Sequence, residues 1–148
     1  MIIYIGSDHN GFHLKGMLKE YLIKSNYKLV DDGDDHLDPV DDFPVFASRV
    51  VNAILASVDD DPRGILICGS GQGMCMAANR FKGIRACLAF DNESARSSRN
   101  DDDSNIICIP ARILKDESTF SIIHTWLTTP FAKSPRFIRR ITEMDNLN

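Results

Sequence analysis

Short apolar runs alternate with amphipathic stretches along the whole chain, and this alternation predicts β-strands that take turns with α-helices. Strands are expected at residues 2–7, 27–30, 65–67, 85–90 and 105–109. Apolar positions three or four residues apart predict helices between and after the strands. The helices are expected around residues 14–22, 43–55, 74–80, 92–100, 120–127 and 136–144.

This order predicts an α/β fold, with a five-stranded, mostly parallel sheet between two layers of helices, one on each face. The 148 residues fit a single domain, 1–148, that is long enough to bury a core. In the helix at 43–55 we expect the apolar residues Phe46, Val50, Val51, Ile54 and Leu55 on one face. The acidic segment 31–42 contains Gly33 and Pro39 and is expected to be a loop.

The composition narrows the class of protein. Hydrophobic residues make up 43% and charged residues 26%, which is typical of a soluble globular protein. The net charge of −4 argues against electrostatic binding to nucleic acid or to a membrane surface. No apolar run is long enough to cross a membrane, and the first residues do not resemble a signal peptide. We therefore expect a cytoplasmic protein.

The four cysteines form no CxxC pair. Cys75, Cys87 and Cys108 lie among apolar or small residues, so we expect reduced, buried thiols. A disulfide framework or a zinc site is not indicated.

Residues 64–86, GILICGSGQGMCMAANRFKGIRA, carry the clearest chemical signal. An apolar strand breaks through glycines into a helix, which gathers free backbone N–H groups and the positive end of the helix dipole around one point. This turn favours an anion such as a phosphate or an enolate. Cys68 is the first residue of the turn, and a thiolate there would be a competent base or nucleophile.

Two plainer interpretations of this turn stay open: a tight structural connection, and a core cysteine at position 68. The spacing is not that of a P-loop, which ends in Gly-Lys-Ser/Thr. It also departs from the dinucleotide fingerprint GxGxxG, because the glycines alternate.

Ligands of open α/β sheets bind at the carboxyl ends of the strands. Four groups of ionisable residues follow predicted strands: Asp8 with His9, Cys68 with its glycine turn, the run 101–103 through its helix, and Arg112. Together they are typical of an active site. Asp8 and His9 could instead form a helix cap, and the acidic run could be a charged helix end.

The motifs GSDHNGF, DDFP, ILICGSGQG, AANRFKGIRA, SRNDDDSN and PAR stand in this order along the chain. In this combination the chain resembles the ribose-5-phosphate isomerase type B family over about residues 2–141. That family includes galactose-6-phosphate and allose-6-phosphate isomerases. The resemblance implies a Rossmann-like fold, a phosphorylated sugar as substrate, and no metal or other cofactor. It also implies a homodimer or dimer of dimers whose active sites draw on two subunits.

The resemblance also implies roles for individual residues. Cys68 would be the base that moves a proton between C2 and C1, with Ser70 where the family has Thr or Ser. Asp8 would contact the sugar and His9 would lie near its phosphate. The remaining expected contacts are backbone N–H groups of Gly69, Gly71, Gln72 and Gly73 to the enediolate, and Arg112, Arg136 and Arg140 to the phosphate and substrate. Arg139 is expected to face solvent or a second subunit.

The chain departs from the family pattern at one place. Asp101 stands where the family commonly has a histidine assigned to opening the sugar ring, and Asp102 replaces the following asparagine. An ordinary carboxylate is ionised at neutral pH and cannot donate a proton. Ring opening would therefore be weaker, or would fall to Asp101 with acidic neighbours, or to another group such as His36.

The expected activity is interconversion of ribose 5-phosphate and ribulose 5-phosphate. Two alternatives stay open. One is isomerisation of a hexose 6-phosphate, such as allose or galactose 6-phosphate, and the other is a catalytically silent sugar-phosphate binder.

Overall fold

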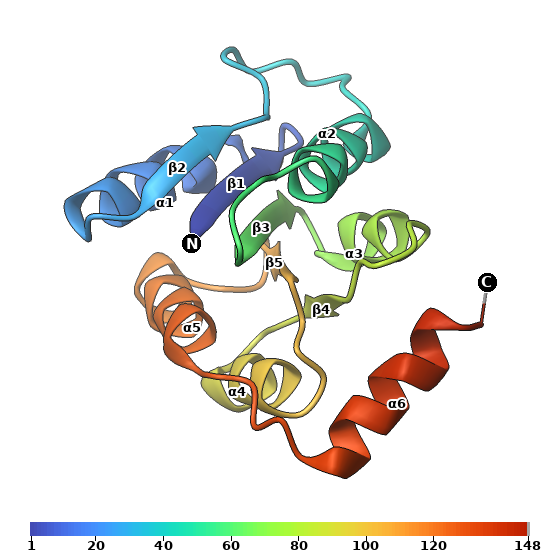
Figure 1. The fold of residues 1–148 in the computed structure, drawn as a ribbon. Helices are drawn as coiled ribbons and strands as arrows, with labels where there is room; N and C mark the ends of the chain where they lie inside the picture. The colour runs from blue at the N-terminus through green and yellow to red at the C-terminus, as the bar shows by residue number, and fades with distance from the viewer. Residues whose placement is uncertain (148) are drawn as a thin grey trace.

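The computed structural model of the protein describes residues 1–147. In chain order the elements are β1 (Ile2–Ser7), α1 (Phe12–Lys24), β2 (Lys28–Asp31), α2 (Phe43–Leu55), β3 (Pro62–Cys68), α3 (Gln72–Ala78), β4 (Ala86–Leu88), α4 (Asn92–Asn100), β5 (Ile106–Pro110), α5 (Asp116–Thr128) and α6 (Pro135–Asp145). The strands form one sheet in the order β2-β1-β3-β5-β4 (Figure 1). The predicted α/β fold is confirmed, and every strand pair is parallel.

The sheet separates two apolar cores. Along β3, Ile65 and Ile67 join a cluster with residues of α1, α4 and α5, whereas Leu66 and Cys68 join a cluster with α2 and α3. This division follows from the strand geometry, in which successive side chains point to opposite faces. The predicted three layers are therefore present, with α1, α4 and α5 on one face and α2 and α3 on the other.

Two strands differ in length from their predictions. β3 begins at Pro62, three residues before the expected start, because Arg63 is buried there with satisfied donors. Arg63 pairs with Asp61 and donates to the carbonyl oxygens of Trp126 and Leu127. A buried, fully partnered arginine interrupts the apolar pattern without ending the strand. β4 spans only Ala86–Leu88 and is shorter than expected.

Three expectations about burial were wrong. Leu55, expected on the same helix face as the buried Val50 and Ile54, is 51% exposed, since it is the last residue of α2. Cys75 and Cys87 are partly rather than fully buried, whereas Cys108 lies within the core as expected. All four cysteines are free thiols.

Close packing at Gly11 holds the start of α1 against the end of β3. A Cβ atom at this position would lie 2.6 Å from Ile67 Cγ2 and 2.8 Å from the Ile67 carbonyl oxygen. The backbone N–H of Asp8 also donates to that carbonyl oxygen, at 3.2 Å. The absent side chain therefore lets β1 and β3 end side by side.

Replacing Gly11 by alanine should lower the free energy of unfolding by about 1–3 kcal/mol, because overpacking against Ile67 forces the backbone to shift. Gly16→Ala is the matched control, since no atom lies within 4 Å of a Cβ there. In the middle of α1 this control should be neutral or stabilising by up to about 1 kcal/mol. Urea unfolding measures both, and equal stabilities of the two variants would contradict the packing argument.

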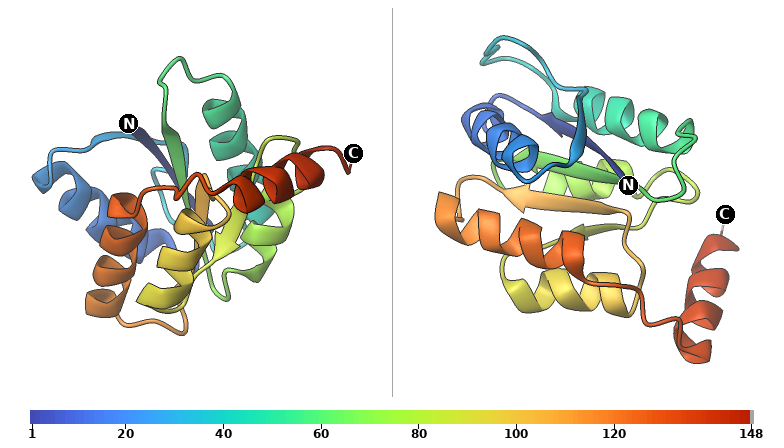
Figure 2. Two further views of the ribbon diagram at one scale, coloured as in Figure 1. Left: turned by 60° about the horizontal axis from the view of Figure 1, so that its bottom comes forward. Right: turned by 60° about the vertical axis from the view of Figure 1, so that its left-hand side comes forward.

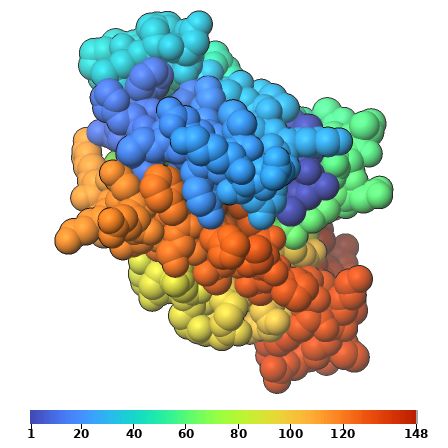
Figure 3. Space-filling model, turned by 90° about the vertical axis from the view of Figure 1, so that its left-hand side faces the viewer, coloured from blue at the N-terminus to red at the C-terminus, as the bar shows by residue number. Residues whose placement is uncertain are grey.

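The last helix, α6, stands away from the body of the molecule (Figure 2). In the space-filling view the end of the chain forms a lobe at the lower right (Figure 3). Phe137 is the one residue of α6 that is buried, while Ile138 and Met144 are 48% and 43% exposed. Within a single chain α6 therefore leaves much of its surface uncovered.

Candidate active site

Cys68 is the last residue of β3, and the glycine turn that leads to α3 begins directly after it. It is 5% exposed, and the backbone N–H of Gly71 donates to its Sγ at 3.1 Å. Gly71 has a φ of 73°, and a Cβ atom there would collide with the side chain of Leu88. The turn around the sulfur therefore depends on glycine at this position.

The rest of the turn is equally compact. Ser70 Oγ accepts a hydrogen bond from the backbone N–H of Gln72 at 3.3 Å. A Cβ atom on Gly73 would lie 2.8 Å from the ring of Phe43, the first residue of α2. The segment from Gly69 to Gly73 thus presents backbone rather than side chains beside the Cys68 sulfur.

Asp8 follows β1 and is 6% exposed. Its Oδ1 accepts from the backbone N–H groups of Asn10 and Gly11, at 2.9 and 3.2 Å. These bonds support the capping interpretation that the sequence left open, although the residue at the N-cap of α1 is Gly11. Asp8 therefore fixes the turn between β1 and α1, and its carboxylate stays at the edge that carries Cys68.

His9 is held by the acidic loop. Its Nδ1 lies 2.6 Å from Asp41 Oδ1, and its backbone N–H donates to the same oxygen at 3.1 Å. The Asp41 side chain is 8% exposed and the His9 side chain 31%. One edge of the His9 ring is thus buried against a carboxylate.

Arg112 follows β5 and reaches back over the glycine turn. Its backbone N–H donates to the Gly69 carbonyl oxygen at 3.0 Å, and a Cβ atom on Gly69 would lie 2.9 Å from its Nε. Its Nη2 donates to Asn10 Oδ1 at 2.6 Å. Three of the four predicted groups, from the ends of β1, β3 and β5, therefore meet at one edge of the sheet.

The fourth group, residues 101–103, does not lie with the other three. The prediction that it stands at the carboxyl edge of the sheet was wrong. β4 and β5 are parallel, so α4 runs back between them and delivers Asp101 to the opposite edge. Four residue steps of β5 at ~3.3 Å each separate the two edges by about 13 Å. Asp103 has a φ of 49° and forms ion pairs with Arg85 and Arg99. Asp103 therefore links α4 to the residue that precedes β4 and does not act as an acidic neighbour of Asp101.

Asp101 and Asp102 make a carboxylate pair at this second edge. Burial, and next the charge of Asp101, raise the pKa of Asp102, and the guanidinium of Arg140 partly offsets the rise. Asp101 Oδ1 accepts from Asn100 Nδ2 at 2.6 Å. The guanidinium carbon of Arg136 lies 4.7 Å from the centre of the Phe137 ring. The expected residues 101, 102, 136 and 140 thus belong to α4 and α6, away from Cys68 in the same chain.

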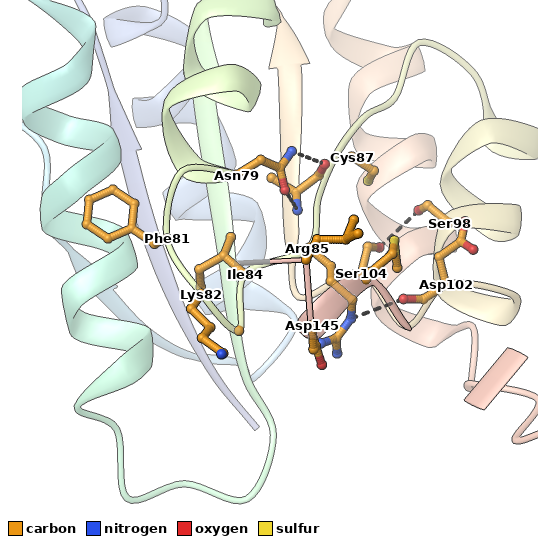
Figure 4. A pocket seen from close by; sticks show the side chains of 14 residues that line it. Asn79, Phe81, Lys82, Ile84, Arg85, Cys87, Ser98, Asp102, Ser104 and Asp145 are labelled. Carbon is orange, nitrogen blue, oxygen red and sulfur yellow. Dashed lines mark hydrogen bonds between the residues drawn. The ribbon is translucent and has the colours of Figure 1, made fainter. Parts of the chain in front are cut away.

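A pocket of about 500 Å³ lies beside this second group (Figure 4). Asp102 and Ser104 line one side of it, and Arg85 and the end of α6 line others. Its lining does not include any residue of the glycine turn. The pocket therefore lies at the edge of the sheet opposite Cys68.

Sequence reasoning missed Asn10 and Asp41 as site residues. Asn10 stands inside the motif GSDHNGF, but only its contacts reveal its importance. Asp41 carries no sequence signal, because seven of the residues from 31 to 42 are aspartates. His36, the alternative proton donor, is exposed and pairs with Asp35, and that hydrogen bond raises its pKa.

Two further findings describe the chain up to residue 147. None of the helices there has the length and apolar character needed to cross a lipid bilayer. Within the same residues, no group of three or more His, Cys, Asp or Glu side chains is arranged to hold a metal ion.

Known proteins resemble this chain over nearly its full length. The family model described as Ribose/Galactose Isomerase matches residues 3–144. A probable ribose-5-phosphate isomerase B of Mycoplasma pneumoniae is 39% identical, over 87% of this chain and 84% of its own. The crystal structure of a ribose 5-phosphate isomerase from Thermotoga maritima is 41% identical, with a TM-score of 0.92 over 98% of this chain and 97% of that one. A Mycoplasma genitalium ribose-5-phosphate isomerase B, solved with ribulose-5-phosphate bound, is 36% identical, with a TM-score of 0.90 over 97% and 93%.

Proposed function

Because the chain belongs to the ribose/galactose isomerase family, we propose that it interconverts ribose 5-phosphate and ribulose 5-phosphate through an enediolate, with Cys68 as the base. The names of its relatives support the substrate, as does the relative solved with ribulose-5-phosphate bound. The observation that carries the proposal is the Cys68 sulfur beside the backbone of a glycine turn, next to Asp8, His9 and Arg112.

The reaction needs one base and donors for a developing oxyanion. The Cys68 thiolate removes the proton from C2 of the open-chain aldose, and the C1 oxygen takes up the negative charge. Return of the proton to C1, with transfer of the hydroxyl proton from O2 to O1, gives the ketose. The N–H groups between Gly69 and Gly73 suit the enediolate oxygens, since fixed donors need no rearrangement as charge develops.

Turnover in D₂O tests the enediolate directly. Ribulose 5-phosphate formed in D₂O should carry solvent deuterium at C1, because a proton held by a thiol exchanges with water. Proton NMR of the product measures this incorporation. Complete absence of deuterium would contradict a proton-transfer mechanism and favour transfer of a hydride between the two carbons.

The active site is completed by a second copy of the chain. Asp101, Asp102, Arg136 and Arg140 lie at the edge opposite Cys68, too far to reach the same substrate. A two-fold axis repeats each surface on both copies, so one copy's α4 and α6 can meet the other copy's glycine turn. The uncovered surface of α6 supports this arrangement. Arg136 and Arg140 then add to the phosphate site with Arg112, and the state is a homodimer or a dimer of dimers.

Ring opening falls to the Asp101–Asp102 pair. A donor of protons to the ring oxygen must hold a proton near neutral pH, which an ordinary carboxyl group does poorly. Burial and the like charge of Asp101 raise the pKa of Asp102 in the direction that this task needs. Two adjacent carboxylates that share one proton are a known way to keep an acid protonated.

If ring opening limits the rate, Asp101→His should increase turnover on ribose 5-phosphate, which is mainly cyclic. Imidazole holds and releases a proton near neutral pH far better than a carboxyl group. Initial rates with cyclic ribose 5-phosphate measure the effect, with ribulose 5-phosphate, which has no ring to open, as the control substrate. No gain with the cyclic substrate would show that ring opening is not impaired.

A hexose 6-phosphate is the second candidate substrate, favoured by the galactose in the description of the matching family. Allose and galactose 6-phosphate extend the same chemistry by one carbon between the carbonyl and the phosphate. The ratio of kcat/KM values for the pentose and the hexoses decides between them.

A further inference from the structure

The side chain of Asn10 connects three groups of the site. Its Oδ1 accepts from Arg112 Nη2 at 2.6 Å. Its Nδ2 lies 3.3 Å from Asp8 Oδ2 and 2.9 Å from His9 Nε2. Every polar atom of this amide is therefore engaged, and each partner comes from the edge that carries Cys68.

Two of these partners fix which way the amide points. A guanidinium can only donate, so the atom facing Arg112 must be the amide oxygen. A carboxylate can only accept when ionised, so the atom facing Asp8 must be the amide nitrogen. The reversed amide would oppose donor to donor at Arg112 and acceptor to acceptor at Asp8.

This orientation also fixes the tautomer of His9. The Asn10 nitrogen donates, so His9 Nε2 must accept and carries no hydrogen. On the other side Asp41 Oδ1 accepts at 2.6 Å, so His9 Nδ1 carries the hydrogen. The chain of bonds Asp41–His9–Asn10–Arg112 is thus consistent from end to end, with a neutral His9 ring.

We propose that Asn10 is a positioning residue for phosphate recognition, which is itself oriented by Asp8 and His9 and holds the Arg112 guanidinium in place before substrate arrives. The proposal rests on the proposed function, in which the phosphate end of a sugar binds there. Asp41 completes the assembly from the acidic loop. Asn10 acts through Arg112, without being required to touch the reacting carbons.

The physical advantage is preorganisation. A free arginine side chain loses much rotamer freedom when it closes on a ligand, which weakens binding. Asn10 restricts that freedom beforehand, while a guanidinium has five N–H donors and gives one to Asn10. The others are available to phosphate oxygens, which accept strongly from arginine.

Asn10→Ala tests the proposal, with Asn92→Ala as the matched control. Asn92 is an asparagine whose side chain bonds to Ser121, between α4 and α5, and not to any of the residues discussed above. Loss of one bond to a charged group should weaken binding of inorganic phosphate about tenfold and raise KM for ribose 5-phosphate by a similar factor. The value of kcat should stay within about twofold, and the control should match wild type in all three. Calorimetry with inorganic phosphate and initial-rate kinetics measure these quantities.

A ¹⁵N NMR spectrum of the histidine rings adds a signature that a merely structural role would not move. The wild type without phosphate should show His9 as the Nδ1–H tautomer, and Asn10→Ala should shift the Nε2 resonance, because Nε2 loses the hydrogen bond that it accepts from Asn10. The missing signal in His9→Gln assigns the resonance. The wild-type spectrum alone tests the proposal even where the variant does not fold, since an Nε2–H tautomer there would overturn it.

The proposal fails if Asn10→Ala binds inorganic phosphate as tightly as wild type, or if wild type does not bind phosphate. Failure of the proposed function has a different result. A wild type that binds phosphate in an Asn10-dependent way but leaves ribose 5-phosphate unchanged would support the positioning role and contradict the isomerase.

Discussion

Replacing Cys68 by alanine should lower kcat by about 10²–10⁴-fold, the range expected for loss of a general base. The Cys68 sulfur is the one ionisable side-chain atom that receives a backbone N–H bond within the glycine turn. A donor beside the sulfur stabilises negative charge there, and the fixed N–H groups of the turn do not supply a base themselves. Binding of ribose 5-phosphate should persist, because Arg112 and His9 are untouched.

Cys75→Ala is the control for this variant. Hydrogen bonds from Cys108 and then Asn79 lower the pKa of the Cys75 thiol, so this cysteine is the main rival to Cys68 as the base. It lies in α3, and its Sγ donates to the Ala86 carbonyl oxygen rather than facing the turn. Loss of kcat in Cys75→Ala together with full activity in Cys68→Ala would contradict the assignment of the base.

Mixing two nearly inactive variants, Cys68→Ala and Arg140→Ala, should restore about a quarter of the wild-type activity. A heterodimer then has one site that combines an intact Cys68 with an intact Arg140 from the other chain, and one site that lacks both. Half of the randomly formed dimers are heterodimers. Refolding the two variants together and measuring isomerase activity tests this prediction.

Cys68→Ala mixed with Arg112→Ala is the matched control. Arg112 lies over Gly69 in the same chain as the Cys68 that it serves, so no mixed dimer contains an intact site. This mixture should remain as inactive as its components. Equal recovery in both mixtures, or none in either, would contradict a site shared in the proposed way.

The fold was accessible from sequence because its strands are short apolar runs. Strands β1 and β5 and helix α4 were predicted to within one residue at either end, helped by the polar residues Asp8 after β1 and Asn105 before β5. The start of β3 was missed because Arg63 is buried through partners that are distant in sequence, Trp126 and Leu127. No local pattern reveals a charge that is satisfied by the end of α5.

The candidate site was only partly predictable for the same reason. The rule that ligands bind at the carboxyl ends of strands brought Asp8, Cys68 and Arg112 together correctly as neighbours. It failed for Asp101, because a helix between parallel strands carries its last residue to the other edge. The role of Asn10 depends on side-chain contacts with Arg112, 102 positions away, which sequence spacing does not encode.

The central claim is tested most directly by incubating the purified wild type with ribose 5-phosphate in the presence of a metal chelator and following ribulose 5-phosphate by NMR. The account predicts steady conversion to an equilibrium mixture, unaffected by the chelator, and at least tenfold greater kcat/KM than for allose or galactose 6-phosphate, a difference of about 1.4 kcal/mol in transition-state binding. No conversion of ribose 5-phosphate, with or without turnover of a hexose 6-phosphate, would contradict it.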